Sequence, residues 1–302
     1  MREAVALAER VSRTGTNVLV TGESGSGKDV VASFIHAKSS RAARPFVKID
    51  CATLPGALLE AELFGYERGA FTGATQAKPG RFEAADKGTI VLDEIAHLST
   101  DAQAKLLRVI EEREFERLGG RKTIKLDARL IALTNVDLEG AVRLRRFRED
   151  LFYRLNVIQI TVPPLRERKE DLSKLIQYFV KQYATKHGRK VERVTPPALK
   201  LLQAYDYPGN ARELSNILER AVIVATGNSI EEQDLPSHVS AAVNAKRQKE
   251  KPLSLAQLEA AYISEILAAT GGNKAESARI LGISRKNLYE KIARYELVTR
   301  IR

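Results

Sequence analysis

The feature that most constrains this chain is a glycine-rich loop between an apolar run and a helical pattern. The segment 22–28 reads Gly-Glu-Ser-Gly-Ser-Gly-Lys and matches the phosphate-binding pattern G-x-x-x-x-G-K. Its glycines allow backbone N–H groups to wrap phosphates, and the helix that follows adds the positive end of its dipole. The pattern alone arises by chance in about one chain in ten of this length, but the apolar run 17–20 supplies the context that the motif requires. The candidate nucleotide-binding residues are Gly22, Glu23, Ser24, Gly25, Ser26, Gly27 and Lys28.

A second apolar run, 89–94, ends in two adjacent carboxylates, Asp93 and Glu94. Asp93 is the candidate Mg²⁺ ligand, and Glu94 is the candidate water-activating carboxylate. The residue after Lys28, usually a Ser or Thr that ligates Mg²⁺, is Asp29. Two interpretations of Asp29 are open: it acts on the metal through a water molecule, or it only favours the helix N-terminus. The sequence therefore predicts binding of ATP with Mg²⁺.

Short β-branched runs alternate with segments of helical spacing in the first half of the chain. This alternation predicts an α/β domain with a mainly parallel sheet, whose ligand site lies beyond the carboxyl ends of the strands. The predicted strands span 17–22, 45–51, 89–94, 128–135 and 156–163.

After residue 163 the strand signals stop and the pattern becomes helical. Thr195 before a proline predicts one helix N-terminus. Asn210 predicts a second, with Asn210 as the cap and Glu213 reaching back. Residues 241–252 are polar and end in proline, which is typical of a linker. The predicted parts are an α/β domain (1–163), a helical subdomain (164–240), a linker (241–252) and a C-terminal module (253–302).

The C-terminal module combines helix caps with positive charge. Helix starts are predicted after Ser254, after Asn273 with Glu276 closing a capping box, and after Ser284. Three helices with a glycine-containing turn before the third predict a helix-turn-helix. Residues 241–302 hold 12 Lys and Arg against 6 Asp and Glu, within a chain of net charge +11. The candidate DNA-binding residues are Ser284, Arg285, Lys286, Asn287 and Lys291.

Two alternatives to DNA binding are open for the C-terminal module: a solvated basic face, and a basic module that docks another protein.

The composition of the whole chain limits the classes of protein to which it can belong. Hydrophobic residues make up 44% of the 302 residues, so the chain can bury a core. A single cysteine, Cys51, excludes an internal disulfide and fits a reducing compartment. Because no apolar run is long enough to span a bilayer, we expect a soluble, cytoplasmic protein without membrane contact.

The segment Gly69, Ala70, Phe71, Thr72, Gly73, Ala74 is the most specific motif in the chain. By composition it is a small-residue loop with one apolar tip, and one alternative is a turn whose Phe71 packs inward. This hexapeptide is expected by chance in only about one chain in 10⁵. It resembles the signature loop of bacterial enhancer-binding proteins, the AAA+ ATPases that activate RNA polymerase carrying sigma-54. The likeness covers nearly the whole chain, from Met1 through the helix-turn-helix.

The resemblance implies a fold and a set of roles. The fold is an AAA+ P-loop ATPase domain with a helical lid and a Fis-type helix-turn-helix. The hexapeptide would contact sigma-54, and residues 118–120 would form the second pore loop. The remaining implied roles are sensor I for Thr134 and Asn135, arginine fingers toward a neighbouring subunit for Arg148 and Arg154, sensor II for Arg212, and a restraint on Glu94 for Asp50, where the family often has Asn.

Physical arguments leave three of these roles open. Arg212 lies in the first turn of a predicted helix, where its charge opposes the helix dipole. It either holds a phosphate between the two subdomains or pairs with a carboxylate. Arg154 could pair with Asp150 at i, i+4 instead of serving as a finger. Asp50 would repel Glu94 unless it is protonated or bridged.

We therefore expect a sigma-54-dependent activator of the two-component type that binds double-stranded enhancer DNA. It would hydrolyse ATP in a homo-oligomeric ring, a hexamer by resemblance, and convert the closed complex of the polymerase into an open one. The DNA-binding module would pair two chains. The likeness starts at the first residue, so we expect that the family's upstream regulatory domain is either absent or was removed from this chain. A rival hypothesis is a DNA-binding regulator whose nucleotide site only switches assembly.

Overall fold

The computed structural model describes residues 1–250 and 254–297, with side chains described for all of these except 246–250. The chain forms two compact units, Met1–Ser240 and Ala241–Arg302. Within the described residues, no helix has both the length and the apolar composition that a membrane span needs.

The first unit is built around a parallel sheet in which every predicted strand is present. The order of the strands is β2-β5-β8-β1-β9, and each pairs with its neighbours in parallel. The expected α/β class is therefore confirmed. All six residues of the central strand β8 are buried, as expected for a strand covered on both faces. The strands are β1 (Val18–Thr21), β2 (Phe46–Asp50), β5 (Thr89–Asp93), β8 (Arg129–Thr134) and β9 (Ile158–Thr161).

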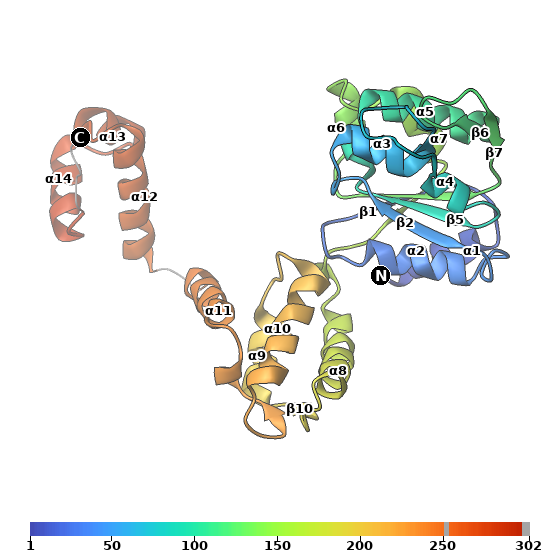
Figure 1. Cartoon of the computed structure of the whole chain (residues 1–302). Coiled ribbons are helices and arrows are strands. Elements are labelled where there is room, and N and C mark those ends of the chain that lie inside the picture. Colours follow the sequence, from blue (N-terminus) through green and yellow to red (C-terminus); the bar gives the residue numbers. More distant parts are fainter. Residues whose placement is uncertain (251–253, 298–302) are drawn as a thin grey trace. The chain divides into compact units, whose positions relative to one another are not determined.

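Helices cover both faces of this sheet (Figure 1). On one face lie α1 (Arg2–Ser12) and α2 (Lys28–Ala37), and on the other lie α3 (Gly56–Phe64), α5 (Thr100–Glu112) and α7 (Glu149–Leu155). Successive residues of β1 enter opposite cores: Val18 and Val20 pack with the first pair of helices, and Leu19 with the second group. Between these helices lie short elements: β3 (Gly65–Tyr66), β4 (Lys78–Pro79), α4 (Arg81–Ala84), η1 (Ile95–His97), β6 (Glu114–Glu116), β7 (Thr123–Lys125) and α6 (Leu138–Arg143).

The helical subdomain that follows is close to the predicted one, but its caps differ. The Thr195 side chain does not cap α9, because its hydroxyl donates to the Ile230 carbonyl. Asn210 is the first residue of α10 rather than its cap, so that prediction is wrong; Gly209 is the cap. Glu213 does reach back, accepting from the Gly209 amide at 2.8 Å. The elements are η2 (Leu165–Glu167), α8 (Lys169–Lys186), β10 (Arg193–Val194), α9 (Pro196–Ala204), α10 (Asn210–Val224), β11 (Ser229–Ile230) and η3 (Glu232–Asp234).

The predicted linker is helical over most of its length. Helix α11 (Ser237–Glu250) runs through residues 241–250, which are rich in good helix formers, while 251–253 lie outside the described residues. The three predicted helices follow as α12 (Leu255–Ala269), α13 (Lys274–Ile280) and α14 (Arg285–Arg294).

The caps of these last helices are largely as predicted. The side chains of Ser254, Asn273 and Ser284 each accept a hydrogen bond from a backbone amide of the helix that follows. Glu276 does not close a capping box, because its carboxylate pairs with Arg279 three residues on. Local attraction between opposite charges at i, i+3 explains the difference.

The core of the small unit is made by Ile263, Leu267, Ala278 and Leu288. A second apolar face of α12 is exposed: Leu255, Leu258 and Tyr262 are 86%, 56% and 52% accessible.

Candidate nucleotide site and its associated loops

The glycine-rich loop joins β1 to α2 at the carboxyl edge of the sheet. Two of its glycines lie against other backbone segments. A Cβ on Gly22 would lie 2.6 Å from the Val162 carbonyl oxygen, and one on Gly25 would lie 2.4 Å from that of Gly209. Both have positive φ, 151° and 72°. Only glycine fits both the conformation and the contact at these positions.

Lys28 lies in the concave side of this loop. Its ammonium donates to the carbonyls of Gly22 at 2.9 Å and Glu23 at 3.3 Å. It also lies 3.9 Å from Glu94 Oε1. The loop lysine and the strand-end glutamate, identified separately in the sequence, are thus adjacent.

Asp93 and Glu94 end β5 in an uncommon backbone geometry. Glu94 has φ 53° and ψ 48°, in the left-handed region that non-glycine residues rarely adopt. Its amide donates to Asp93 Oδ1 at 3.0 Å, and its Oε2 atom is buried without a hydrogen-bond partner in the described part of the chain. Strained backbone at such a position is typical of functional sites.

Lys48, which sequence reasoning missed, joins two carboxylates at this edge. Its ammonium lies 2.8 Å from Asp93 Oδ2 and 3.0 Å from Asp29 Oδ2. Burial raises the pKa of Asp29, but its hydrogen bond with Lys48 and the attraction of that charge outweigh burial, so the pKa is lowered. The carboxylates of Asp29 and Asp93 both pair with the Lys48 ammonium, so they lie close to each other. Carboxylate oxygens are the ligands that Mg²⁺ prefers. These residues fit a divalent metal.

Asp50 lies next to Asp93 in the sheet, since the two residues are register partners. Its carboxylate accepts from the Ala52 amide at 2.9 Å, within the turn after β2. The next residue, Cys51, is buried, and burial first and then the nearby Asp50, Asp93 and Glu94 raise the pKa of its thiol to about 12. Cys51 therefore stays a neutral thiol at physiological pH.

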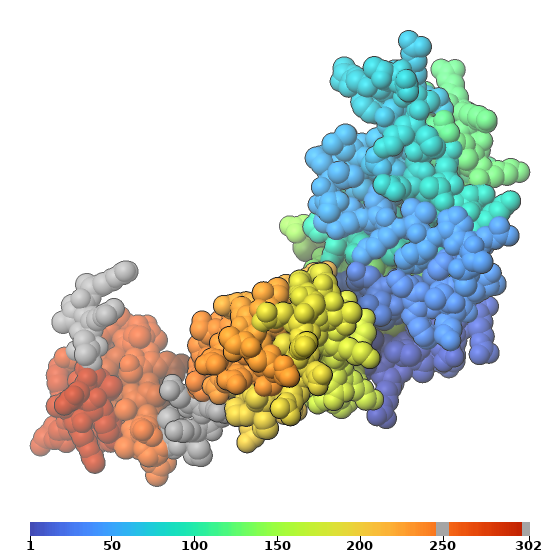
Figure 2. Space-filling model, turned by 60° about the horizontal axis from the view of Figure 1, so that its bottom comes forward, coloured from blue at the N-terminus to red at the C-terminus, as the bar shows by residue number. Residues whose placement is uncertain are grey.

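The helical subdomain reaches the loop through α10. In Figure 2 the yellow part of this subdomain adjoins the blue surface of the α/β domain. Arg212 Nη1 donates to Ser24 Oγ at 3.0 Å. Asn210, buried and at φ 55°, donates to Glu23 Oε2 at 3.0 Å and to the Ser24 carbonyl at 3.1 Å. Its own side-chain oxygen accepts from the Leu165 amide at 2.8 Å. Among the described residues, the side-chain hydrogen bond of Arg212 is therefore with the loop and not with a carboxylate.

Two more arginines of the helical subdomain hold the loop, and neither was singled out in the sequence. Arg166 makes two hydrogen bonds to the Glu23 carboxylate, at 2.8 and 2.6 Å. These bonds, with that from Asn210, lower the pKa of Glu23 to about 2. Arg168 is buried and donates to the Ser26 carbonyl at 2.6 Å. The sequence places these residues about 140 positions from the loop, so no local pattern indicates the contacts.

Thr134 and Asn135 end β8 beside the loop. The Thr134 carbonyl accepts from the Gly22 amide at 3.2 Å, and its buried hydroxyl accepts from the Val136 amide at 3.0 Å. Asn135 is exposed and, with Gly22 and Glu23, lines a cavity of about 380 Å³.

The two candidate fingers lie apart from this site in their own chain. Arg148 is the N-cap residue of α7, with its side chain 40% exposed, and makes two hydrogen bonds to Asp150, at 3.0 and 2.7 Å. Arg154 pairs with Glu111 at 2.8 Å, so the alternative pair of Arg154 with Asp150 is not formed. Asp150 lies in the first turn of α7, and its carboxylate accepts from Arg148, two residues before it. Neither arginine makes a polar contact with the glycine-rich loop within the described residues of the chain.

The hexapeptide 69–74 forms a closed loop with an exposed tip. The Gly69 amide donates to the Ala74 carbonyl at 2.8 Å, and the Ala74 amide donates to the Phe71 carbonyl at 3.0 Å. Phe71 is 41% exposed and meets Tyr66 edge-on, with ring centroids 4.9 Å apart. Thr72 beside it is exposed. Phe71 is therefore not packed inward, and the tip presents an apolar and a hydroxyl group.

The second predicted pore loop lies against the base of the first. Leu118 pairs through its backbone with Glu67 at 3.0 Å and with Gly65 at 2.9 Å. A Cβ on Gly119 would lie 2.9 Å from that of Ala70. The two loops therefore touch, although their sequences are about 50 residues apart.

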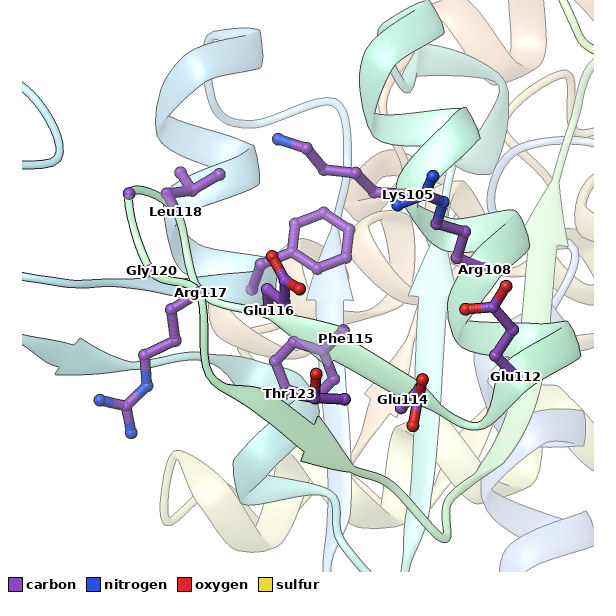
Figure 3. A pocket seen from close by; sticks show the side chains of 12 residues that line it. Lys105, Arg108, Glu112, Glu114, Phe115, Glu116, Arg117, Leu118, Gly120 and Thr123 are labelled. Carbon is purple, nitrogen blue, oxygen red and sulfur yellow. The ribbon is translucent and has the colours of Figure 1, made fainter.

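A cavity of about 290 Å³ lies behind the second loop, between α5 and β6 (Figure 3). Lys105 and Arg108 project toward it from the helix. Arg117 beside the loop bonds to the Glu83 carboxylate at 2.9 and 2.7 Å and to Glu67 at 3.1 Å. These ion pairs tie the hairpin of the second loop to the segments that flank the first.

In the small unit, most candidate DNA-binding side chains are exposed on the first turn of α14. Arg285, Lys286 and Asn287 are all accessible, and Ser284 Oγ accepts from the Asn287 amide at 3.2 Å. Lys291 differs, because its ammonium pairs with Glu259 of α12 at 2.6 Å and is only 21% exposed.

Comparison with known protein families accounts for each part of the chain. Residues 1–161 match the model of the sigma-54 interaction domain, residues 166–252 that of the AAA+ ATPase lid domain, and residues 254–295 that of the Fis family of bacterial regulatory proteins.

Named relatives and a solved structure agree with these matches. The chain is 46% identical over 294 residues to regulatory protein AtoC of Escherichia coli (strain K12), covering 95% of this chain and 64% of AtoC. It is 47% identical over 286 residues to transcriptional regulatory protein ZraR of Klebsiella oxytoca, covering 94% and 65%. NtrX from Brucella abortus, crystallised with ATP, superposes with a TM-score of 0.72 at 36% identity, over 98% of this chain and 67% of NtrX. The chain thus spans about two thirds of the length of these relatives.

The family models together cover almost the whole chain, and the first alone covers more than half of it. The chain therefore belongs to the family of sigma-54-dependent enhancer-binding proteins.

Proposed function

We propose that this chain hydrolyses ATP between the subunits of a ring and uses the energy to remodel the sigma-54 polymerase from a closed to an open promoter complex. The observation that carries the proposal is the pairing of two features in one compact unit. Lys28 lies 3.9 Å from Glu94 at a phosphate-binding loop, and the tip of the sigma-54 contact loop, Phe71 and Thr72, is exposed.

The glycine-rich loop and Lys28 would bind the phosphates of ATP, through backbone amides and the lysine charge. Asp93 would hold Mg²⁺, with Asp29 on the same side of the site, in direct contact or through a water molecule. Bound Mg²⁺ would neutralise the charge that develops on the phosphates. The crystallisation of NtrX with ATP supports this choice of nucleotide.

Glu94 would accept the proton of the attacking water, and its position at a strained strand end fixes its carboxylate. Arg148 of the partner subunit would stabilise the transferred phosphoryl group. The Arg148 side chain is 40% exposed and lies away from its own loop, which supports a role in trans. Arg212 would report the nucleotide state to the helical subdomain through Ser24. A hexamer is the ring that the family resemblance implies.

The small unit would recruit this ATPase to double-stranded enhancer DNA. Arg285 and Asn287 can donate to base edges, and Lys286 can neutralise phosphate. The exposed apolar face of α12 supports pairing of two such units, which would read a two-fold symmetric site. A DNA-bound regulator of this kind would work in the cytoplasm.

The experiment that tests the proposal measures phosphate release and open-complex formation with purified sigma-54 polymerase, for the wild-type chain and for Lys28→Ala. We expect the wild-type chain to support both and the variant to support neither. The rival hypothesis of a nucleotide-controlled switch requires ATP-dependent assembly without sustained phosphate release. Steady-state turnover by the wild-type chain would exclude that rival.

A further inference from the structure

A buried glutamine, Gln103, lies between the end of β5 and the segment that carries Arg148. It occupies the first turns of α5 and is 1% exposed. Its Nε2 donates to the Leu98 carbonyl at 2.9 Å and to the Arg146 carbonyl at 3.2 Å, and its Oε1 accepts from the Arg148 amide at 2.8 Å. One side chain therefore satisfies three backbone groups.

Only a primary amide of this length supplies two hydrogen-bond donors and one acceptor to these backbone groups. Two of its partners are carbonyls, which require donors, and the third is an amide, which requires an acceptor. A carboxylate would face the two carbonyls without a donor, and an apolar side chain would leave all three backbone groups without this partner. Because buried polar groups without partners are costly, the site selects glutamine.

The segment held by Gln103 is otherwise shaped by its own backbone. Arg145 adopts φ 56°, an unfavourable conformation for a residue with a Cβ. The amides of Arg146 and Phe147 both donate to the Ala141 carbonyl, at 2.9 and 3.3 Å. Further along the chain, Gln103 accepts a hydrogen bond from the Arg148 amide. The Arg148 guanidinium is in turn oriented by its hydrogen bond to Asp150.

We propose that Gln103 is a positioning residue that fixes the backbone of Arg148 so that its guanidinium meets the nucleotide of the partner subunit. This inference rests on the proposed role of Arg148 in trans. The hydrogen bond from Gln103 to the Leu98 carbonyl also connects this side chain to the segment that follows Glu94, four residues after it. Gln103 thus makes the finger rigid relative to the core of its own subunit. A displacement of about 1 Å at a transferring group can cost about 10² in rate.

The test uses the full chain with Gln103→Met, which has a similar shape but neither donors nor an acceptor of comparable strength. Gln177→Met, on the exposed face of α8, is the matched control. We expect Gln103→Met to bind a fluorescent ATP analogue normally and to lose about 10² in turnover. The control should match the wild type. Wild-type turnover by Gln103→Met would overturn the proposal.

Mixed rings separate a role through Arg148 from a role through Glu94. Gln103→Met subunits should regain turnover when mixed with Glu94→Gln subunits, because some interfaces then combine an intact Glu94 with an intact finger. They should not regain turnover when mixed with Arg148→Ala subunits. The reverse pattern would show that Gln103 acts through Glu94 and would overturn the proposal.

The pair Arg148→Ala with Glu94→Gln is the control for trans action, and its failure to regain turnover would count against the proposed function itself.

Backbone hydrogen exchange tests Gln103 independently of assembly. The Arg148 amide should exchange about tenfold faster or more in Gln103→Met, and unchanged exchange would overturn the inference. If Gln103→Met does not fold, Gln103→Asn replaces it, since it keeps the amide but is one methylene too short to reach all three backbone groups; the Arg148 amide should again exchange faster.

Discussion

At the scale of single residues, the site depends on carboxylates held in fixed positions. Glu94 has a left-handed backbone, its Oε1 atom lies near Lys28, and its buried Oε2 atom has no hydrogen-bond partner among the described residues. We predict that Glu94→Gln retains ATP binding while turnover falls by about 10² or more, because loss of a general base commonly costs 10² to 10⁴. Phosphate release and binding of a fluorescent ATP analogue check this. Glu170→Gln, on exposed α8, is the matched control, and near-normal hydrolysis by Glu94→Gln would contradict the assignment.

Lys48 provides a second residue-scale prediction. Its ammonium lies between Asp29 and Asp93, where it repels a divalent cation that these carboxylates would bind. Lys48→Met should therefore bind Mn²⁺ in the presence of a non-hydrolysable ATP analogue several-fold more tightly, a change of about 1 kcal/mol for charges at this separation. Mn²⁺ titration followed by electron paramagnetic resonance measures the affinity. Lys174→Met is the control, and unchanged or weaker Mn²⁺ binding by Lys48→Met would show that Lys48 does not compete with the metal.

The sequence could predict the residues of the site that lie in local motifs, but not their long-range partners. The loop at Lys28 and the pair Asp93 and Glu94 each follow a strand, so the sequence could predict that both lie at the carboxyl edge of the sheet, although not that β8 alone separates β1 from β5. Lys48 was missed because its role depends on β2 lying next to β5, and strand order has no local signal. Arg168 was missed because its contact with the loop depends on how the helical subdomain docks.

At the scale of elements, the strands were predicted well because each is a short β-branched run bounded by turns. The capping errors have a common cause. Asn210 and Glu276 fit cap patterns, but tertiary and local partners take their side chains: Asn210 bonds to Glu23, and Glu276 pairs with Arg279. The short pairs β3–β4 and β6–β7 are too short to give a periodic signal.

Helix α14 carries the element-scale prediction. Its first turn exposes Arg285, so Arg285→Ala should weaken binding to DNA sites selected by the wild-type chain from a random duplex pool. The expected loss is about 1–3 kcal/mol, with relaxed base preference at one position. Arg279→Ala removes an equal charge from α13, where it pairs with Glu276, and serves as the control. Equal losses for both variants, without a change in base preference, would mean that α14 does not read bases.

At the scale of the whole molecule, the proposed mechanism of hydrolysis requires two chains at each site. Arg148→Ala subunits and Glu94→Gln subunits should each be inactive alone, but mixtures should regain turnover at interfaces that combine both intact residues. Because an arginine finger contributes about 10³ to 10⁵ in rate, the gain should be measurable. Mass measurement of differently tagged subunits verifies that the rings are mixed. No gain in verified mixed rings would exclude Arg148 as the finger in trans.

In the proposed function, the contact loops connect this hydrolysis to the polymerase. The tip at Phe71 and Thr72 carries no charged side chain, and its base packs on the second loop through Gly119. Changes at the tip should therefore separate ATP consumption from work on the promoter.

The most direct measurement is phosphate release and open-complex formation on one preparation of Thr72→Ala, with sigma-54 polymerase and with Thr75→Ala, an exposed threonine just beyond the loop, as the control. The account predicts that Thr72→Ala assembles and hydrolyses ATP near the wild-type rate but fails to open the promoter, whereas Thr75→Ala does both. If both activities of Thr72→Ala fell together, or if both survived, the claim that this loop transmits the energy of hydrolysis to sigma-54 would be contradicted.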